Sequence, residues 1–534
     1  MKEWIAFLLP PALAFVGMRL ARLVLGRKFE DGLGFGLGFA LGLGVGMVVF
    51  SQTVLLAALA GINLSRMLAW GALVWGGAEI VLRLPEWAAG LRRIKFQPGH
   101  LWLLLLLPVI YSWWVFARLS TLEGTLEADA ISFWVFKSKI LFLEQGKNLL
   151  NLLHQSNLAY AHLDYPMLVP CLYTLGYGAV GGVDEFVNKV WPFWMVVALC
   201  LGILSLAKVW QRPQPLPVVT VVAFCFLPAT FQYIQYEGGT IPMAFFVSLT
   251  ALLVSKAISR VDEFYLAAAI LAAAGCAMTK FEGIVYAAIW FGVLLPLCWR
   301  RGWWKKPILG KSVLVAALCL LPYVWFRLEK PVLHPQSGWW HSGMAAPAST
   351  LHRFPQAWFL NVVGRFFNSD FFQWQSANGN HLHWIGKWTG PNSLVNEQLT
   401  VLPWLLLVLL VLALWKGRDR LALGSLTVVI FGVFTVLSLV IACLANAQSD
   451  LSYVIDFSIA ENMGRYYYPF FAAWFLAVAA AWFDDSLFSQ PAGAPNAPRA
   501  RPPTSRAVPA KEATTHQEQA TFIHGQPVQR QNQP

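Results

Sequence analysis

The amino-acid sequence predicts an all-α protein, a polytopic transmembrane helix bundle of about thirteen spans with interfacial helices in its outer loops. Of its 534 residues, 57% are hydrophobic and only 12% are charged, whereas soluble domains carry about 25% charged residues. Apolar runs of about twenty residues, each long enough to cross a hydrocarbon core as a helix, recur along the chain. Because these runs lack the alternation of a membrane barrel, we expect helical spans and exclude a soluble fold.

The apolar runs define the expected spans. They cover residues 4–25, 33–60, 64–83, 100–119, 187–208, 216–232, 240–257, 264–280, 283–299, 312–327, 399–415, 421–445 and 466–483. The first span ends in basic residues without a small-residue cleavage site, which indicates a retained anchor rather than a signal peptide. Seven glycines between residues 32 and 46 indicate close helix packing in the second span. The seven cysteines lie in or beside apolar stretches, as small core residues do.

Basic clusters set the expected orientation. They lie near residues 27, 92, 208, 256, 300 and 416. All of them fall on the cytoplasmic side of a plasma (inner) membrane if the N-terminus is outside and the C-terminus is cytoplasmic. The net charge of +12 then reflects the positive-inside rule, and no nucleic-acid partner is expected.

Apart from tight turns near residues 62 and 281, this orientation leaves four segments on the outer face, 120–186, 233–239, 328–398 and 446–465. We expect residues 165–180 to form an interfacial or re-entrant helix, because a further span there would break the charge pattern downstream. The chain then divides into N-terminal transmembrane helices (1–99), a main membrane domain (100–485) and a disordered cytoplasmic tail (486–534) that is poor in large apolar residues.

Charged residues at the outer boundary are the candidate functional groups, because a charge inside a span costs at least about 2.5–3.5 kcal/mol. Glu127 and Asp129 follow the fourth span and open an aromatic-rich segment that continues through Trp134 to Lys137 and Lys139. We expect this segment to be a helix in the outer headgroup layer. The alternative is a solvated acid beside an interfacial helix.

A short outer turn carries the second acidic candidate. Glu237 is followed by Gly238 and Gly239, which would bring the backbone close to another group. Because hard cations prefer carboxylate oxygens, Glu237 and Asp129 are candidate ligands of a divalent metal ion. A plain solvated turn is the alternative.

Two further places suit a phosphate group. In Thr279-Lys280-Phe281-Glu282-Gly283, Lys280 offers a point charge, and Glu282 keeps the pair nearly neutral when no lipid is bound. The alternative is an ion pair at a helix end. Arg465 opens the last span, at a depth where a guanidinium can bind a lipid phosphate through two hydrogen bonds or simply anchor the helix at the interface.

The large outer loop, 328–398, is rich in histidine and tryptophan. The residues are His334, His341, His352, His381, His383, Trp339, Trp340, Trp374, Trp384 and Trp388. The histidine spacing is not that of a closed zinc site. The tryptophans are suited to contact with sugar or lipid.

In their order along the chain, these residues resemble the C-type glycosyltransferase superfamily, which includes protein O-mannosyltransferases and aminoarabinose transferases. The resemblance covers roughly residues 100–485. It rests on Asp129 ahead of Trp134 and Lys137, His162-Leu163-Asp164-Tyr165-Pro166, the Glu237 turn, Thr279-Lys280-Phe281-Glu282-Gly283, and Arg465. The chain departs from the pattern in having three extra spans before Asp129 and Gly-Gly where many relatives carry another Asp.

The resemblance implies an enzyme, an inverting glycosyltransferase of the cell envelope. It would move a sugar from a polyprenyl-phosphate carrier to a glycan, lipid or protein acceptor on the outer face of the bilayer. Asp129 would act as general base, a role generally worth about 10²–10⁴ in rate, and Glu237 would orient the acceptor or help bind a metal. The substrate-binding residues would be Lys137, His162, Asp164, Lys280, Glu282 and Arg465, with Lys280 and Arg465 on the lipid phosphate.

Two other functions share this topology. A transporter or flippase of lipid-linked sugars would need charges deep in the spans, of which Glu79 is the clearest, and two related halves, which the sequence does not show. A polymerase or ligase for surface polysaccharide would rely more on the Arg and His residues of a large outer loop.

Overall fold

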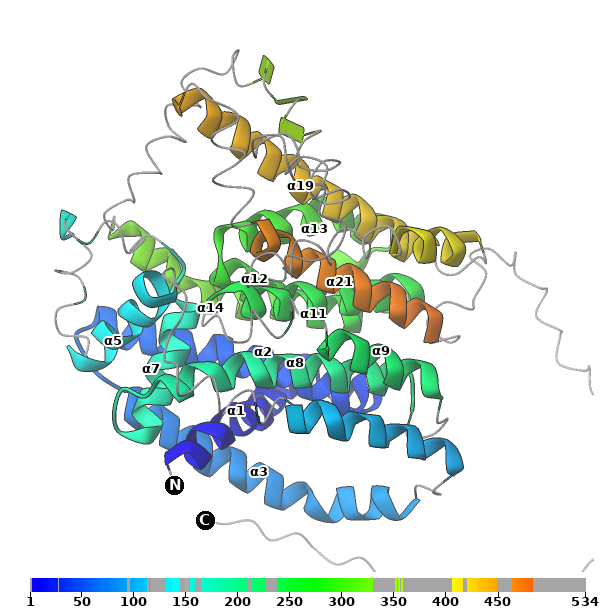
Figure 1. Cartoon of the computed structure of the whole chain (residues 1–534), viewed down its shortest axis with the longest axis horizontal. Coiled ribbons are helices and arrows are strands. Elements are labelled where there is room, and N and C mark those ends of the chain that lie inside the picture. The colour runs from blue at the N-terminus through cyan, green and yellow to red at the C-terminus, as the bar shows by residue number, and fades with distance from the viewer. Residues whose placement is uncertain are drawn as a thin grey trace, which may run out of the picture. The chain divides into compact units, whose positions relative to one another are not determined.

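The computed structural model contains only helices in the part of the chain that it describes (Figure 1), which confirms the all-α class. It describes residues 2–26, 28–93, 97–112, 115, 130–144, 149, 151, 154–156, 158, 165–209, 214–226, 230, 238–329, 351–352, 354–355, 357–358, 406–415, 420–448 and 463–483. For 30–31, 87–93, 130–132, 440–448, 463–467 and 483, only the backbone is described. All of these residues belong to one unit, Met1–Gln490. The predicted disordered tail lies outside the described residues.

The described helices follow one another along the chain in the order of their labels. In order they are α1 (Lys2–Leu25), α2 (Lys28–Leu59), α3 (Ser65–Arg93), η1 (Pro98–Leu105), η2 (Ala130–Val135), α5 (Phe136–Leu143), α7 (Leu168–Val180), α8 (Glu185–Leu206), α9 (Pro215–Cys225), α11 (Thr240–Arg260), α12 (Glu263–Thr279), α13 (Phe281–Arg300), η4 (Trp303–Lys305), α14 (Pro307–Leu328), α19 (Arg420–Gln448) and α21 (Met463–Phe483).

Eight helices in the described residues are long and apolar enough to cross a membrane, and they coincide with eight of the predicted spans. By their length and composition, these helices indicate a multi-pass membrane protein. The other five predicted spans coincide with shorter apolar helices, 98–112, 215–225, 263–279, 406–415 and 468–482. The predicted total of about thirteen spans therefore stays a prediction beyond these eight.

Glycines allow the N-terminal helices to pack closely. A Cβ on Gly42 or Gly46 of α2 would overlap a backbone carbonyl of α1, and one on Gly36 would overlap the carbonyl of Leu201 in α8. A Cβ on Gly76 of α3 would lie 2.6 Å from the Cα of Ala12 in α1. The packing role predicted for the glycine series is thus confirmed.

The central helices α11 and α12 are enclosed by protein, whereas α13 and α14 are not. Figure 1 shows α11 and α12 between α2 and α8 on one side and α13 and α19 on the other. In the most apolar stretch of α11, 100% of the residues are buried. In the corresponding stretches of α13 and α14, only 28% are buried. We therefore expect α13 and α14 to face lipid along most of their length. α7, the predicted interfacial or re-entrant helix, is buried at every residue.

Helix directions define two ends of the bundle. Gly239 at the start of α11 lies beside Lys280, where α12 ends and α13 begins, and α14 ends beside Phe281. We call this the site end. At the opposite end, Lys306 ahead of α14 pairs with Glu263 at the start of α12, at 3.5 Å.

The predicted basic clusters gather at the opposite end. Tyr265 near the start of α12 donates a hydrogen bond to the Gly32 carbonyl near the start of α2, at 2.9 Å. α8, α11 and α13 finish at this end. Its described cations include Lys28, Lys208, Arg260, Arg300, Arg301, Lys305 and Lys306. Four of the six predicted clusters, those near residues 27, 208, 256 and 300, thus share one end, and the orientation in the membrane stays a prediction.

Candidate functional site

Cationic and aromatic side chains from five segments meet at the site end. We call Trp134, Lys137, Tyr165, Lys280, Phe281 and Arg327 the cation–aromatic cluster. The Nζ of Lys137 lies 5.3 Å from the ring centroid of Trp134 and 5.8 Å from that of Tyr165. The Tyr165 ring stands edge-on to Phe281 at 5.0 Å, and the Cζ of Arg327 lies 5.4 Å from the Phe281 centroid. All three distances from a cation to a ring centroid are within the range of cation–π attraction.

Gly239 connects Lys280 with this cluster. A Cβ on Gly239 would lie 3.0 Å from the Cε of Lys280 and 3.0 Å from the Cζ2 of Trp134. Both side chains thus contact the same stretch of backbone, which a residue larger than glycine would push away. The close approach predicted from the two-glycine turn is found at Gly239.

The buried face of α5 directs Lys137 inward. Lys137 is 3% exposed, and Ser138 beside it donates a hydrogen bond to the carbonyl of Val135 at 2.7 Å. The Thr174 hydroxyl of α7 lies 2.8 Å from the carbonyl oxygen of Pro170 and 3.2 Å from that of Ser138, so its single proton is shared between them and α5 lies directly against α7. Burial raises the pKa of the Cys171 thiol in α7, and the positive charge of Lys137 opposes that shift.

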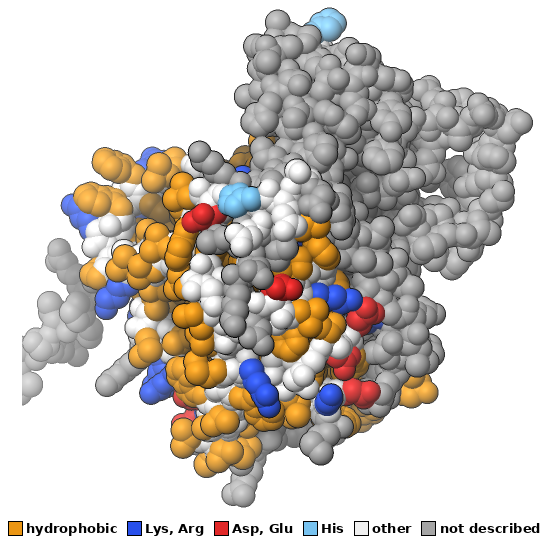
Figure 2. Space-filling view, turned by 90° about the vertical axis from the view of Figure 1, so that its left-hand side faces the viewer, with side chains coloured by type: hydrophobic (Ala, Val, Ile, Leu, Met, Phe, Trp, Pro, Cys, Tyr) orange, Lys and Arg blue, Asp and Glu red, His pale blue; other side chains and the backbone are white. Residues whose placement is uncertain are grey.

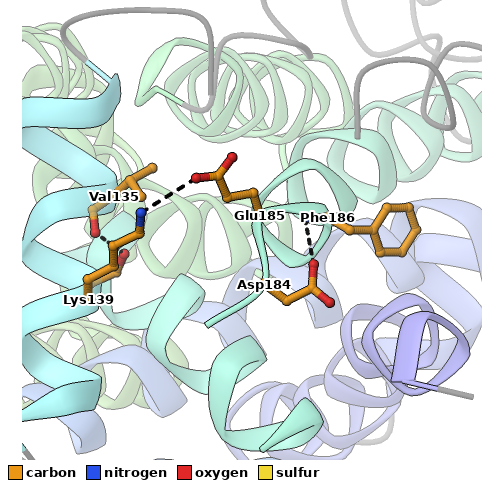
Figure 3. A network of polar contacts seen from close by, with 6 residues as sticks. Val135, Lys139, Asp184, Glu185 and Phe186 are labelled. Atoms are coloured by element: carbon orange, nitrogen blue, oxygen red, sulfur yellow. Dashed lines mark hydrogen bonds and ion pairs between the residues drawn. The ribbon is translucent and has the colours of Figure 1, made fainter. Parts of the chain in front are cut away.

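An ion pair holds the outer side of α5 (Figure 3). Lys139 Nζ lies 3.5 Å from Glu185 Oε1 at the start of α8. Asp184 caps α8 by accepting a hydrogen bond from the Phe186 N–H at 3.0 Å, a favourable arrangement at a helix N-terminus. Lys137 and Lys139 on one short helix thus have different surroundings, one inside the cluster and the other at a half-exposed ion pair.

The predicted Thr-Lys-Phe-Glu-Gly segment forms the turn between α12 and α13. Thr279 donates to the carbonyl of Cys276 at 2.8 Å, and Lys280 is extended, with φ −148° and ψ 165°. Glu282 lies in the first turn of α13, where an acidic side chain is favourable. A Cβ on Gly283 would overlap the Cys276 carbonyl, so glycine lets the two helices meet closely. A single extended residue therefore places the Lys280 side chain at the site end.

The direction of α21 brings Arg465 to the same end. Tyr468 shares a 2.8 Å hydrogen bond with Thr230, and the ring of Phe475 stacks on Phe224 at 5.9 Å. α21 therefore runs antiparallel to α9, which leads toward Gly238. Arg465, in the first turn of α21, is thus at the site end by its backbone position.

The level of Arg465 follows from a second contact. The rings of Phe470 and Tyr286 lie 5.7 Å apart. Arg465 precedes Phe470 by as many residues as Phe281 precedes Tyr286. At an equal rise per residue, the backbones of Arg465 and Phe281 reach a similar level. The side chain of Arg465 lies outside the described residues.

Four predicted site residues, Asp129, His162, Asp164 and Glu237, lie outside the described residues, and so does the metal site predicted between Asp129 and Glu237. The residues that follow three of them are described. Ala130 begins η2, Tyr165 belongs to the cluster, and Gly238 precedes the glycine that contacts Lys280. Within the described residues, no group of three or more His, Cys, Asp or Glu side chains could hold a metal ion.

Sequence reasoning missed Arg327, Phe281 and the aromatic role of Tyr165. A signal for Arg327 was present, because it ends a span on the expected outer face, where the positive-inside rule disfavours basic residues. Lys137 and Lys280 break the rule in the same way. For the two rings there was no such signal, since aromatic residues are common at both membrane faces.

Glu79, the acid that a transporter function would need, has basic partners. Its carboxylate lies 3.8 Å from Arg19 Nε in α1 and 3.7 Å from Arg83 Nε in α3. The side chains of Glu79 and Arg83 are both mostly buried. Its charge is therefore compensated within the α1–α3 contact.

Figure 2 views the side of the molecule on which α5 and the end of α14 lie in Figure 1. Acidic and basic side chains occur together on this face, among hydrophobic ones. Beneath such a surface, buried cations beside aromatic rings suit a ligand that joins an anionic group to an apolar chain. Lys137 and Lys280 are 3% and 7% exposed, so their charges are weakly screened by water.

Comparison with known proteins gave no relative: no protein-family model, no curated protein and no solved structure matches this chain. Function must therefore be inferred from the chain's own residues.

Proposed function

We propose that this protein is an inverting membrane glycosyltransferase that moves a sugar from a polyprenyl-phosphate carrier to an acceptor on the outer face. The observation that carries the proposal is the cation–aromatic cluster. Lys137, Lys280 and Arg327 reach one place from three separate helical segments, at one end of an apolar bundle. Such a place suits the phosphate of a lipid whose chain stays in the bilayer.

The cluster residues would bind the donor. Lys137, Lys280 and Arg327, with Arg465 at a similar level, would hold the phosphate before and after transfer. The positions of Lys137 and Lys280 are fixed by packing, so these two cations would stabilise the charge that develops on the leaving phosphate without rearranging. The apolar chain of the donor would lie along lipid-facing helices such as α13 and α14.

The reaction needs a base as well as a phosphate site. The acceptor hydroxyl would attack the anomeric carbon opposite the phosphate, the carbon–oxygen bond to the phosphate would break, and polyprenyl phosphate would leave with the electron pair. Asp129 would take the proton of the hydroxyl, and Glu237 would orient the acceptor. His162, Asp164 and Glu282 complete the proposed substrate contacts. A divalent ion bound by Asp129 and Glu237 would supply further positive charge.

The test is a transfer assay with purified protein in liposomes and a panel of polyprenyl-phosphate sugars. One donor should be consumed with release of polyprenyl phosphate. Asp129→Asn keeps the size of the side chain but cannot accept a proton, so it should lower turnover by at least roughly a hundredfold. Movement of an intact lipid-linked sugar across the bilayer, without release of polyprenyl phosphate, would instead identify a transporter. Normal turnover in a well-folded Asp129→Asn variant would refute the base.

A further inference from the structure

The turn between α13 and α14 gathers basic residues at the end opposite the cation–aromatic cluster. Its five cations, all exposed, are Arg300, Arg301, Lys305, Lys306 and Lys311. The sequence contains no acidic residue from 283 to 328. In the part of the chain that the structure describes, Glu263 at the start of α12 pairs with Lys306, and Asp262 beside it caps that helix. Among the described residues, the other four cations have no acidic partner.

The turn has a fixed shape. Gly302 has φ 65°, a conformation that glycine adopts without strain, and its N–H donates to the carbonyl of Trp299 at 3.1 Å. Trp303 points inward and is only 4% exposed, and the N–H of Lys306 donates to its carbonyl at 2.8 Å. The cations on either side of Trp303 are therefore presented by an ordered backbone.

Two tryptophans of the turn face outward. Trp299 and Trp304 are 72% and 57% exposed, and their rings stack with centroids 5.7 Å apart. The Nζ of Lys305 lies 5.1 Å from the centroid of Trp304. Tryptophan is enriched at the level of lipid headgroups, where one side of the ring meets apolar chains and the other meets polar groups.

The neighbouring helices place this turn at a membrane face. Exposed apolar side chains, such as Leu295 of α13 and Leu314 of α14, continue from the turn along both helices. α13 has 20 residues, which corresponds to about 30 Å of helix, the thickness of a hydrocarbon core. The turn and the cation–aromatic cluster thus lie at opposite faces of the bilayer, and the turn is a separate site.

We propose that residues 299–311 form a binding surface for the headgroups of anionic phospholipids. The surface matches a lipid molecule from its chains to its phosphate. The apolar helix surfaces would contact the acyl chains, the two exposed tryptophans the glycerol region, and the unpaired cations the phosphate. A basic cluster directly after a transmembrane helix is typical of anionic-lipid recognition. This surface would act independently of the donor site and of the reaction proposed above.

The test measures binding of phosphatidylglycerol and phosphatidylcholine to the full-length protein in detergent by native mass spectrometry. The variant combines Arg300→Gln, Arg301→Gln and Lys305→Gln. The matched control, Lys28→Gln with Lys208→Gln and Arg420→Gln, removes the same charge from scattered positions at the same end. Arg420 begins α19, and the contacts of Gly432 with Ile289 and of Phe434 with Phe470 show that α19 starts at this end. Thermal unfolding of each protein checks the fold.

The wild type should prefer phosphatidylglycerol, and the triple variant in the turn should lose this preference. Each cation near an anionic surface contributes roughly fivefold to binding, so the loss should be about a hundredfold. The control should keep most of the preference. Three results would overturn the proposal: equal binding of the two lipids by the wild type, an equal loss in the control, or inorganic phosphate displacing the bound lipid at a similar concentration.

Discussion

Lys137→Met gives the sharpest test of the cation–aromatic cluster. Methionine fills much of the space of the lysine alkyl chain but carries no charge. Methionine avoids the desolvation cost of an almost fully buried ammonium, and thermal unfolding of the variant measures whether it stays folded. Binding of polyprenyl phosphate should nevertheless weaken, since the variant lacks one of the three described cations of the cluster.

The size of this loss follows from the surroundings of Lys137. A hydrogen bond to a charged group contributes roughly 1.5–3 kcal/mol. The phosphate would retain Lys280 and Arg327, so we expect the lower part of that range, a loss of about tenfold to thirtyfold in affinity. Lys139 is a matched control two positions along the same helix. Its half-exposed pair with Glu185 contributes about 0–1 kcal/mol, so Lys139→Met should change affinity by less than about fivefold.

The assay is isothermal titration calorimetry, in which purified protein in detergent is titrated with polyprenyl phosphate that carries no sugar. Thermal unfolding of both variants checks that they are folded. Unchanged affinity in folded Lys137→Met, or an equal loss in Lys139→Met, would show that the cluster does not bind the phosphate.

Three further predictions concern the bundle, the donor and the orientation. Gly76→Ala should lower the unfolding midpoint, because its Cβ would collide with the backbone of α1, at a cost of about 1–3 kcal/mol. Gly77→Ala is the control and should leave the midpoint unchanged, because a Cβ at Gly77 has nothing within 4 Å. Equal midpoints of the two variants would contradict the close α1–α3 contact. Arg465→Ala should raise the donor concentration needed for half-maximal transfer and also slow turnover, whereas Asp129→Asn should slow turnover alone. A titration of donor separates the two effects. An unchanged half-maximal donor concentration in Arg465→Ala would show that Arg465 does not bind the phosphate. Ser156→Cys should react with an impermeant thiol reagent in intact cells, and reaction only after the membrane is opened would reverse the predicted orientation.

Hydropathy alone predicted the eight long helices, because each carries its own apolar signal. It was less informative for α12, whose 17 residues are enclosed by other helices and need not match the bilayer. The glycines of α2 were also readable, since small residues in a span indicate close packing.

The candidate site was only partly predictable. Lys137 and Lys280 stood out as cations on the expected outer face. Their meeting at Gly239 and Trp134 depends on the antiparallel order of α11 and α12 and on the contact of α5 with α7. Such tertiary contacts have no local signal in one sequence. Arg327 was recognisable as a basic residue on the expected outer face, but its contact with Phe281, which is distant in the chain, was not.

The buried hydrogen bond between Thr230 and Tyr468 has a consequence for biogenesis. The Thr230 hydroxyl donates to the Phe224 carbonyl at 2.9 Å, so the Tyr468 hydroxyl is the donor in the 2.8 Å bond between them. α21, which carries Tyr468, also covers α11. During synthesis, most of the chain emerges before α21 exists. One side of α11 therefore stays uncovered in the membrane until α21 has been synthesised. Packing of α21, the last described helix, completes the assembly of the bundle.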